Sequence, residues 1–139
     1  MRHESPEGSS SRLAAVRSRD TAPELIVRRM LHGMGLRFRL HRRELPGSPD
    51  VVLARHRTVV FVHGCYWHRH SDCPFTQEPG RNSEFWRAKF ARNIERDREN
   101  QGELRRLGWR VVVVWECETR NPAKLGRRLR TLFPEAAAP

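Results

Sequence analysis

Two apolar runs, at residues 58–62 and 109–115, constrain the fold of this chain more than any other part of its sequence. Both have the length and the β-branched residues typical of strands, and the charged stretch 84–107 between them has apolar residues at helical spacing. Two shorter strand-like segments, at 36–40 and 50–53, precede the first run. With 139 residues there is room for one ordinary domain. We therefore expect a single α/β domain, with one central mixed β-sheet flanked by α-helices.

The first predicted helix begins at Thr21, which has Pro23 in the first turn after it and Glu24 at the capping-box position. Gly33 and Gly35 end this helix, and a last helix at about 121–133 closes the domain. The polar residues 1–11 are predicted to form a disordered N-terminal arm, 12–133 the folded domain, and 134–139 a loose C-terminal tail.

The charge of the chain points to a polyanionic partner. Lys and Arg number 27 against 16 Asp and Glu, which gives a formal charge of +11, and 25 of the 27 cations are Arg. Arginine suits phosphate and base-edge recognition through its planar fork. No apolar run approaches the roughly 20 residues of a membrane span, and the first residues lead into no signal-peptide core. We expect a soluble, cytoplasmic nucleic-acid-binding protein.

The three cysteines suggest a metal site rather than disulfides, because their number is odd and no export signal precedes them. Cys65 and Cys73 flank His70 in a polar loop, and Cys117 follows the last predicted strand. Three Cys and one His form a common closed set of zinc ligands. His63 and His68 compete with His70 for the fourth position. The alternative is that Cys117 is a small buried apolar residue and the other two are incidental loop thiols.

A second candidate site combines Asp50, at the head of one strand, with Val62 and His63 at the end of the next. One carboxylate and one main-chain carbonyl would supply the minimum protein ligands of a Mg²⁺ ion that keeps several waters. Asp after Pro is also ordinary turn chemistry. His63 and His68 have the side chain best suited to proton transfer near neutral pH, although either could be a zinc ligand or a surface residue.

Aromatic residues interleaved with cations could stack on bases or wedge between base pairs. Trp67 lies in a loop that no core periodicity explains, and Tyr66 precedes it. Rings at helix starts such as Trp86 are more often in the core, where we place Phe90 and Ile94. On the same helix Asp97 faces inward with Phe90, either in a salt bridge or as part of a site.

Taken together, these residues resemble the very short patch repair (Vsr) endonucleases, which nick one strand at T:G mismatches. The resemblance covers about residues 12–120, and the block around Cys65 is its most specific part. The matching stretches are Arg19-Asp20-Thr21-x-x-Glu24, Leu45-Pro46-Gly47-x-Pro49-Asp50, Phe61-x-His63-Gly64-Cys65-Tyr66-Trp67-His68-x-His70, Ser83-Glu84-Phe85-Trp86, Asn93-x-Glu95-Arg96-Asp97, and Leu107-Gly108-Trp109-Arg110 through Trp115-Glu116-Cys117.

The resemblance implies a restriction-endonuclease-like fold with a structural zinc site, and it implies a role for each matching residue. Asp50 would bind Mg²⁺ together with the main-chain carbonyl of Val62. His68 would transfer a proton, supported by His63, Glu24 and Asp97. The remaining roles would be zinc binding by Cys65, His70, Cys73 and Cys117, insertion into the duplex by Tyr66, Trp67 and Trp86, and further DNA contacts by Lys89 and Asn93.

The activity implied is Mg²⁺-dependent, strand-specific nicking of duplex DNA at T:G mismatches, which arise by deamination of 5-methylcytosine. The resemblance further implies a monomer associated with the bacterial nucleoid, linked functionally to a DNA cytosine methyltransferase and to mismatch-repair proteins. Two alternatives stay open. One is a related nuclease with altered, restriction-like or modification-dependent specificity. The other is a zinc-stabilised DNA-binding module without catalysis.

Overall fold

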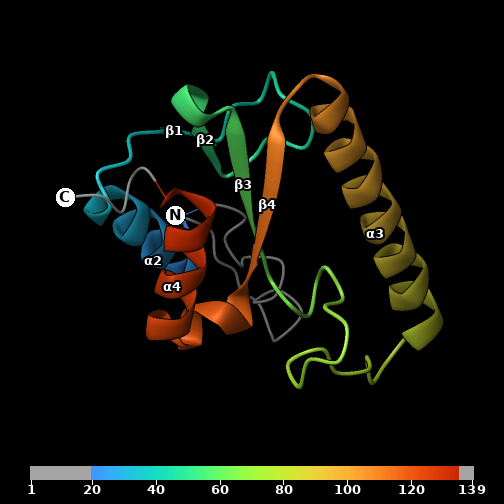
Figure 1. Ribbon diagram of the computed structural model, residues 1–139. Coiled ribbons are helices and arrows are strands. Elements are labelled where there is room, and N and C mark those ends of the chain that lie inside the picture. The colour runs from blue at the N-terminus through green and yellow to red at the C-terminus, as the bar shows by residue number, and fades with distance from the viewer. Residues whose placement is uncertain (1–19, 135–139) are drawn as a thin grey trace.

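The computed structural model describes residues 20–134, which form a four-stranded sheet with helices packed against it (Figure 1). The elements in chain order are α2 (Ala22–Gly33), β1 (Arg39–Leu40), β2 (Val51–Leu53), the 3-10 turn η1 (Ala54–His56), β3 (Thr58–His63), α3 (Ser83–Arg106), β4 (Arg110–Trp115), the 3-10 turn η2 (Glu116–Arg120) and α4 (Pro122–Leu132). The disordered arm predicted for 1–11, the start of the predicted domain and most of the tail predicted for 134–139 lie outside the described residues.

The sheet is mixed, as the sequence predicts. Its strand order is β1-β2-β3-β4, with antiparallel pairing at the first two junctions and parallel pairing between β3 and β4. The crossover between the parallel strands contains the loop after β3 and the whole of α3. The restriction-endonuclease-like class, a mixed sheet flanked by helices, is confirmed.

Alternate residues of the strands face two separate cores, because successive side chains of a strand point to opposite faces. One core joins strand residues to α2 and α4: Val51, Leu53, Val60, Val112 and Val114 pack with Val27, Leu31, Leu125 and Leu129. The other joins Val52, Val59 and Phe61 to Leu104 of α3. Figure 1 shows the resulting three layers, with α2 and α4 together on one side of the sheet and α3 on the other.

The start of α2 differs in one bond from the predicted capping box. The Thr21 hydroxyl caps the helix, accepting from the backbone N–H of Glu24 at 3.4 Å. The Glu24 carboxylate accepts from the N–H of Asp20 at 2.8 Å, and not from that of Thr21. Asp20 has a left-handed backbone with φ of 58°, which places this N–H within reach of Glu24. Glu24 therefore ties down the turn before the helix.

Two expectations about apolar residues are wrong. The strand predicted at 36–40 is reduced to Arg39–Leu40, because the N–H of Leu36 bonds the carbonyl of Leu31 and closes the end of α2. Ile94 is 36% exposed, whereas Phe90 and Leu104 are the buried residues of α3. At 100° per residue, Ile94 lies about 60° from the direction midway between Phe90 and Leu104.

No helix within residues 20–134 combines the length and the apolar character that crossing a bilayer requires.

Candidate active site and metal centre

A pocket lies at one end of the sheet, where β1 and β3 end and β2 begins. Antiparallel pairing brings these ends together, because Leu40 is the register partner of Val51 and the N–H of His41 donates to the carbonyl of Asp50. The cavity of about 350 Å³ is lined by Glu24, His41, Arg43, Gly47, Ser48, Asp50, Phe61, Val62, His63, His68, Asp97, Asn100 and Gln101. Residues from α2, the sheet and α3 thus meet around one space.

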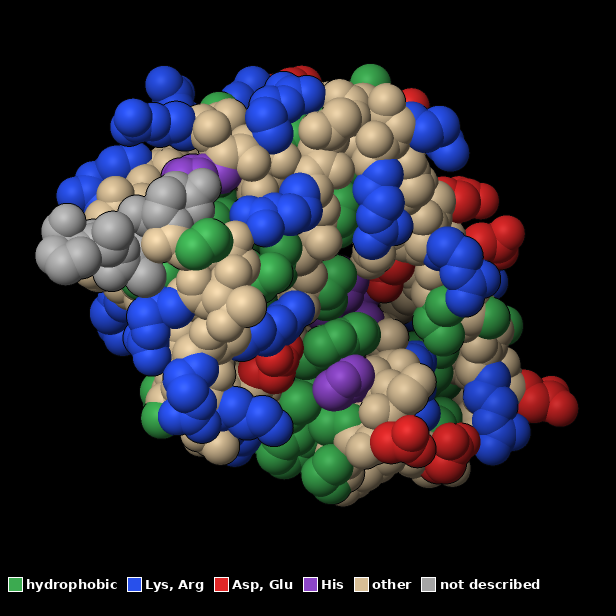
Figure 2. All heavy atoms as spheres, in the orientation of Figure 1, with side chains coloured by type: hydrophobic (Ala, Val, Ile, Leu, Met, Phe, Trp, Pro, Cys, Tyr) green, Lys and Arg blue, Asp and Glu red, His purple; other side chains and the backbone are tan. Residues whose placement is uncertain are grey.

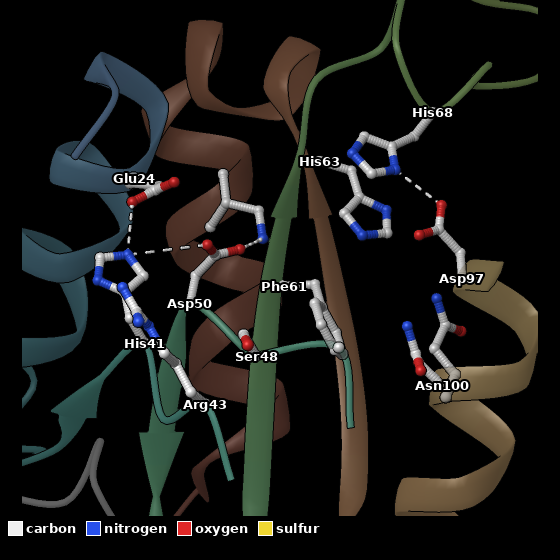
Figure 3. A pocket seen from close by; sticks show the side chains of 13 residues that line it. Glu24, His41, Arg43, Ser48, Asp50, Phe61, His63, His68, Asp97 and Asn100 are labelled. Carbon is white, nitrogen blue, oxygen red and sulfur yellow. Dashed lines mark hydrogen bonds and ion pairs between the residues drawn. The ribbon is translucent and has the colours of Figure 1, made fainter. Parts of the chain in front are cut away.

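One wall of the pocket is acidic (Figure 3). Asp50 lies just before β2, and its Oδ2 accepts from the N–H of Val62 at 2.6 Å. Glu24, only 3% exposed, reaches the same wall from α2. His41 lies between them, with its Nε2 at 3.2 Å from Glu24 Oε1 and 3.9 Å from Asp50 Oδ1. The carboxylates of Glu24 and Asp50 therefore both line the pocket, and the His41 ring contacts both of them.

The environment of Asp50 disfavours its negative charge. Burial raises the pKa of this carboxyl to about 7, with a further rise from the nearby Glu24, while the hydrogen bond from Val62 and the charge of Arg28 act in the opposite direction. Arg28 is itself held by Glu24 at 3.2 Å and by Asp20 at 2.6 Å. A hard divalent cation prefers oxygen ligands of this kind, so the residues present fit the Mg²⁺ site predicted at Asp50 and Val62.

The opposite wall contains two stacked histidines and an aspartate. The rings of His63 and His68 are parallel within 4°, with their centroids 3.8 Å apart. His68 Nδ1 is 2.7 Å from Asp97 Oδ2. Because an ionised carboxylate can only accept, this contact makes Nδ1 the protonated nitrogen of neutral His68 and leaves Nε2 with a free lone pair. The inward orientation predicted for Asp97 is confirmed by this contact.

The two histidines differ in their surroundings. His63 is 5% exposed, and burial lowers its pKa to about 4; the neighbouring His68 lowers it further, and Asp97 opposes this effect. His63 is therefore neutral at physiological pH. It can accept or donate a hydrogen bond toward the pocket without adding positive charge to it.

The predicted zinc ligands converge beside this pocket. His63 pairs with Trp115 in the parallel register of β3 and β4, so Cys65 and Cys117, each two residues further on, emerge from the same end of the sheet. His70 and Cys73 complete the group in the loop, and one donor atom from each of the four residues lies within 4.8 Å of the others.

The spacing of these donors suits a tetrahedral ion. His70 Nδ1 is 3.7 Å from Cys65 Sγ and 3.5 Å from Cys117 Sγ. Zinc bonds of 2.1–2.3 Å arranged tetrahedrally separate neighbouring ligand atoms by about 3.6 Å. Burial raises the pKa of the Cys65 thiol to about 12 and also raises the pKa of Cys117, so these two sulfurs need a cation in order to ionise. At Cys73 burial acts in the same direction, but hydrogen bonds, the first from the backbone of Phe75, outweigh it and lower the pKa. The donor set, its distances and its chemistry all fit Zn²⁺.

The three residues predicted to insert into DNA form one aromatic cluster with Phe90, which is buried beneath them. Tyr66 and Trp67 are 4.9 Å apart, Trp67 and Trp86 5.9 Å, and the Phe90 ring is 5.3 Å from Tyr66 and 6.0 Å from Trp86. Each of the three is half-buried, so each also exposes part of its ring. Phe85, which precedes Trp86 in a stretch that matches the family but was given no role in insertion, adjoins Trp86 and is 59% exposed.

Lys89 and Asn93, the other predicted DNA contacts, differ in their environment on α3. Lys89 is exposed. Asn93 is half-buried, and its Nδ2 donates to the carbonyl of Trp67 at 3.3 Å, so its amide holds the aromatic loop against the helix. Figure 2 shows Lys and Arg side chains spread over the face in view, with a hollow between the sheet and α3 in which acidic and histidine side chains are visible.

Sequence reasoning missed His41 and Asn100, both of which line the pocket. Asn100 follows Asp97 by one helical turn, a spacing that places the two on one face of α3. His41 has a weaker signal, because its contact with Asp50 depends on the register between β1 and β2.

Comparisons with known proteins agree on one family. A family model described as DNA mismatch endonuclease Vsr matches residues 3–74. The chain is 45% identical over 129 residues to the type II nicking enzyme V.XorIIP of Xanthomonas oryzae pv. oryzae, covering 93% of this chain and 94% of that protein. It is also 45% identical over 116 residues to the DNA mismatch endonuclease Vsr of Escherichia coli K12, covering 84% and 74% of the two chains.

Among solved structures, the catalytic domain of the homing endonuclease I-Bth0305I is similar, with a TM-score of 0.58. The match covers 86% of this chain and all of that domain at 18% identity. This likeness concerns the fold alone.

Proposed function

The chain belongs to the Vsr family of DNA mismatch endonucleases and is a hydrolase acting on DNA. On that premise we propose that it nicks duplex DNA at T:G mismatches, with Mg²⁺ as its catalytic cofactor. Such mismatches arise when 5-methylcytosine is deaminated, so the proposed role is to start very short patch repair. One observation carries the proposal: a single pocket has the acidic pair Asp50 and Glu24 on one wall and the bonded pair His68 and Asp97 on the other.

The acidic wall is the proposed metal-binding half of the site. Asp50 and the main-chain carbonyl of Val62 would hold Mg²⁺, with Glu24 supporting its waters. When bound, the metal supplies positive charge that offsets the charge developing on the scissile phosphate. Glu24 keeps its position through Asp20, Arg28 and His41, each within hydrogen-bonding distance of its Oε1.

The histidine wall is the proposed proton-transfer half. His68 Nε2 accepts the proton of the attacking water while the water oxygen bonds to phosphorus. The bond to the sugar oxygen breaks, and this oxygen leaves with the bonding electron pair and takes a proton from solvent. Asp97 fixes the tautomer of His68 and stabilises the imidazolium that forms. His63, neutral because of its lowered pKa, orients water beside His68 without repelling the new charge.

We propose zinc as a structural cofactor at Cys65, His70, Cys73 and Cys117. Protein purified without added metal is expected to contain about one zinc per chain. Cys117→Ala removes a ligand that joins β4 to the loop, so it should lose the zinc and lower the Tm by roughly 5–10 °C. Ser71→Ala, in an exposed position of the same loop, should change neither quantity. Elemental analysis and thermal scans check both, and folded, nicking-competent wild type without zinc would refute the assignment.

We propose that Tyr66, Trp67 and Trp86 enter the duplex beside the mismatch, and that Lys89 and Asn93 support this contact. Inserting a ring costs unstacking energy, which is least where base pairing is already weak. Trp67→Ala should therefore reduce the ratio of single-turnover nicking rates on T:G and C:G duplexes by about tenfold. Phe75→Ala removes an exposed ring that packs under Arg120 and, within residues 20–134, pairs with no ring of the cluster, so it should leave the ratio unchanged. Equal rate losses on both duplexes for Trp67→Ala would contradict the wedge.

A second specificity is favoured by one finding: V.XorIIP, a type II nicking enzyme, matches the chain as well as Vsr of E. coli does. A nuclease with altered, restriction-like or modification-dependent specificity would share the whole site. Nicking of end-labelled duplexes containing T:G, matched or methylated sites in several sequence contexts, with Mg²⁺ or EDTA, separates the two. Preference for T:G supports the proposal, and preference for a matched or methylated duplex supports the alternative. The non-catalytic alternative is disfavoured, because the family is one of nucleases.

We further propose a monomer that acts in the bacterial cytoplasm at the nucleoid, where double-stranded DNA is its partner. The relatives named above come from bacteria. A functional link to a DNA cytosine methyltransferase and to mismatch-repair proteins follows from the proposed substrate, because methylation creates the base whose deamination gives T:G.

A further inference from the structure

Trp115 lies between the cysteine cluster and the nuclease pocket. It is the last residue of β4 and the register partner of His63 at the end of β3. Its ring stacks on that of His70, with centroids 4.2 Å apart and planes 11° apart. On another side it meets the ring of His63 edge to face, at 5.3 Å and 73°. One indole therefore contacts a candidate zinc ligand and a pocket histidine.

These contacts belong to a longer sequence of rings, here called the ring series: His70, Trp115, His63 and His68. The series begins at the sulfurs of Cys65 and Cys117, which approach His70 Nδ1. It ends at His68, whose ring stacks on His63 at 3.8 Å and whose Nδ1 meets Asp97. Consecutive members touch, so a displacement of one ring displaces the next.

His63 depends on this packing for its orientation. Within residues 20–134 no hydrogen bond from the protein reaches its ring nitrogens; the ring is 5% exposed and is bounded by Phe61, His68 and Trp115. Figure 3 shows the ring turned toward the pocket. His68, by contrast, is held by Asp97 at one nitrogen. The free nitrogens of His63 can therefore serve the substrate or its waters only if the neighbouring rings hold them in place.

We propose that Trp115 is a positioning residue, which fixes the His63 ring and, through the stack with His68, the proton-transferring nitrogen. Its contact with His70 anchors the indole to the cysteine cluster, so a metal held by Cys65, His70, Cys73 and Cys117 would stabilise the geometry of the nuclease pocket. The inference rests on the proposed function, because it assumes that His68 and His63 serve phosphodiester cleavage.

The size of the effect follows from the geometry of proton transfer. A misplacement of about 1 Å can cost about 10²-fold in rate. Trp115→Leu keeps an apolar side chain but removes the ring, so the single-turnover nicking rate should fall about 10- to 100-fold. Trp115→Phe keeps a smaller ring and should lose about threefold. DNA affinity and zinc content should match the wild type for both variants.

A double-mutant cycle distinguishes positioning from simple structural support. If Trp115 acts through His63, adding Trp115→Leu to His63→Ala should cost almost nothing further, because the ring to be positioned is gone. The matched control is Trp109→Leu. Trp109 is half-buried, packs under the Arg57 guanidinium at 4.3 Å and borders the core between the sheet and α3. Within residues 20–134 its ring pairs with no ring of the series, so its effect should be smaller and should multiply with that of His63→Ala.

An NMR measurement gives a readout independent of activity. The imidazole signals of His63 and His68 should shift and broaden in Trp115→Leu and should stay unchanged in Trp109→Leu. If Trp115→Leu folds poorly or loses zinc, Trp115→Phe repeats the cycle and the spectrum.

Two results would overturn the inference. One is a double variant of Trp115 and His63 whose rate loss is the product of the two single losses. The other is an NMR spectrum in which the His63 and His68 signals do not change when the indole is removed. A wild type that cleaves no duplex would refute the proposed function instead. The spectra would still decide whether Trp115 orients His63.

Discussion

Asp50→Asn is expected to abolish nicking while leaving binding to mismatched DNA intact. The amide oxygen can still accept from the N–H of Val62, so the turn before β2 is preserved, while the charge that would bind Mg²⁺ is lost. Losing about 4 kcal/mol of transition-state stabilisation corresponds to roughly 10³-fold in rate. Single-turnover nicking and titrations of labelled duplex measure the two quantities separately. A near-wild-type rate would show that Asp50 is not a metal ligand.

The same variant should respond to pH in the opposite sense from an ordinary loss of a carboxylate. Because burial raises the pKa of Asp50 from 3.8 to about 7, the folded protein keeps a proton between about pH 4 and pH 7 that the unfolded chain has lost. The free energy of unfolding of the metal-free protein therefore falls as pH rises through this window. Asn does not ionise, so Asp50→Asn does not lose stability in this way. In EDTA, the Tm of the variant minus the Tm of wild type should therefore be larger at pH 8 than at pH 5.

Added Mg²⁺ gives the matched control for this assignment. A cation that binds only the folded state stabilises it, and at pH 8 it would also pair with the ionised Asp50. Mg²⁺ should therefore raise the Tm of wild type and leave that of Asp50→Asn unchanged. An equal rise in both would show that the ion binds elsewhere.

The sequence predicts the parts of this molecule that depend on residue type and on the spacing of apolar residues along each helix or strand. The strands 58–63 and 110–115 and the helix between them follow from apolar periodicity, which the structure reproduces within one or two residues. The convergence of Cys65, His70, Cys73 and Cys117 was predictable because few other side chains share their preference for one ion.

The parts that sequence reasoning missed depend on register and on ring contacts. His41 contacts Asp50 only because β1 pairs with β2 in one particular register. The loop that joins the two strands does not show this register in its length or its turn residues. Trp115 reads as the end of an apolar strand, and nothing in its spacing shows that it touches His63 and His70. Ile94 is an error in the other direction. Its helical spacing predicted a core position, but it lies at the margin of the buried face and is 36% exposed.

His68→Ala is the second variant with a large expected effect. Asp97 fixes the tautomer of His68, because it bonds Nδ1 of that ring at 2.7 Å and leaves Nε2 free to accept a proton. General acid–base catalysis contributes roughly 10²–10⁴-fold, so the single-turnover rate should fall by about that factor. DNA affinity and Tm should change little, since the side chain is half-buried at the edge of the cavity.

Two further variants make the role of His68 specific. His32→Ala removes an exposed histidine of α2 that lies outside the cavity, and it should nick at the wild-type rate. Asp97→Asn keeps a hydrogen-bonding partner for His68 but allows the wrong tautomer and removes the charge that stabilises the imidazolium, so its rate should fall between those of wild type and His68→Ala. In the combined variant Asp97→Asn should add little to His68→Ala, because both losses remove the same proton acceptor. Losses that multiply would instead place Asp97 in a separate role, and an unimpaired His68→Ala would move proton transfer to another group of the pocket.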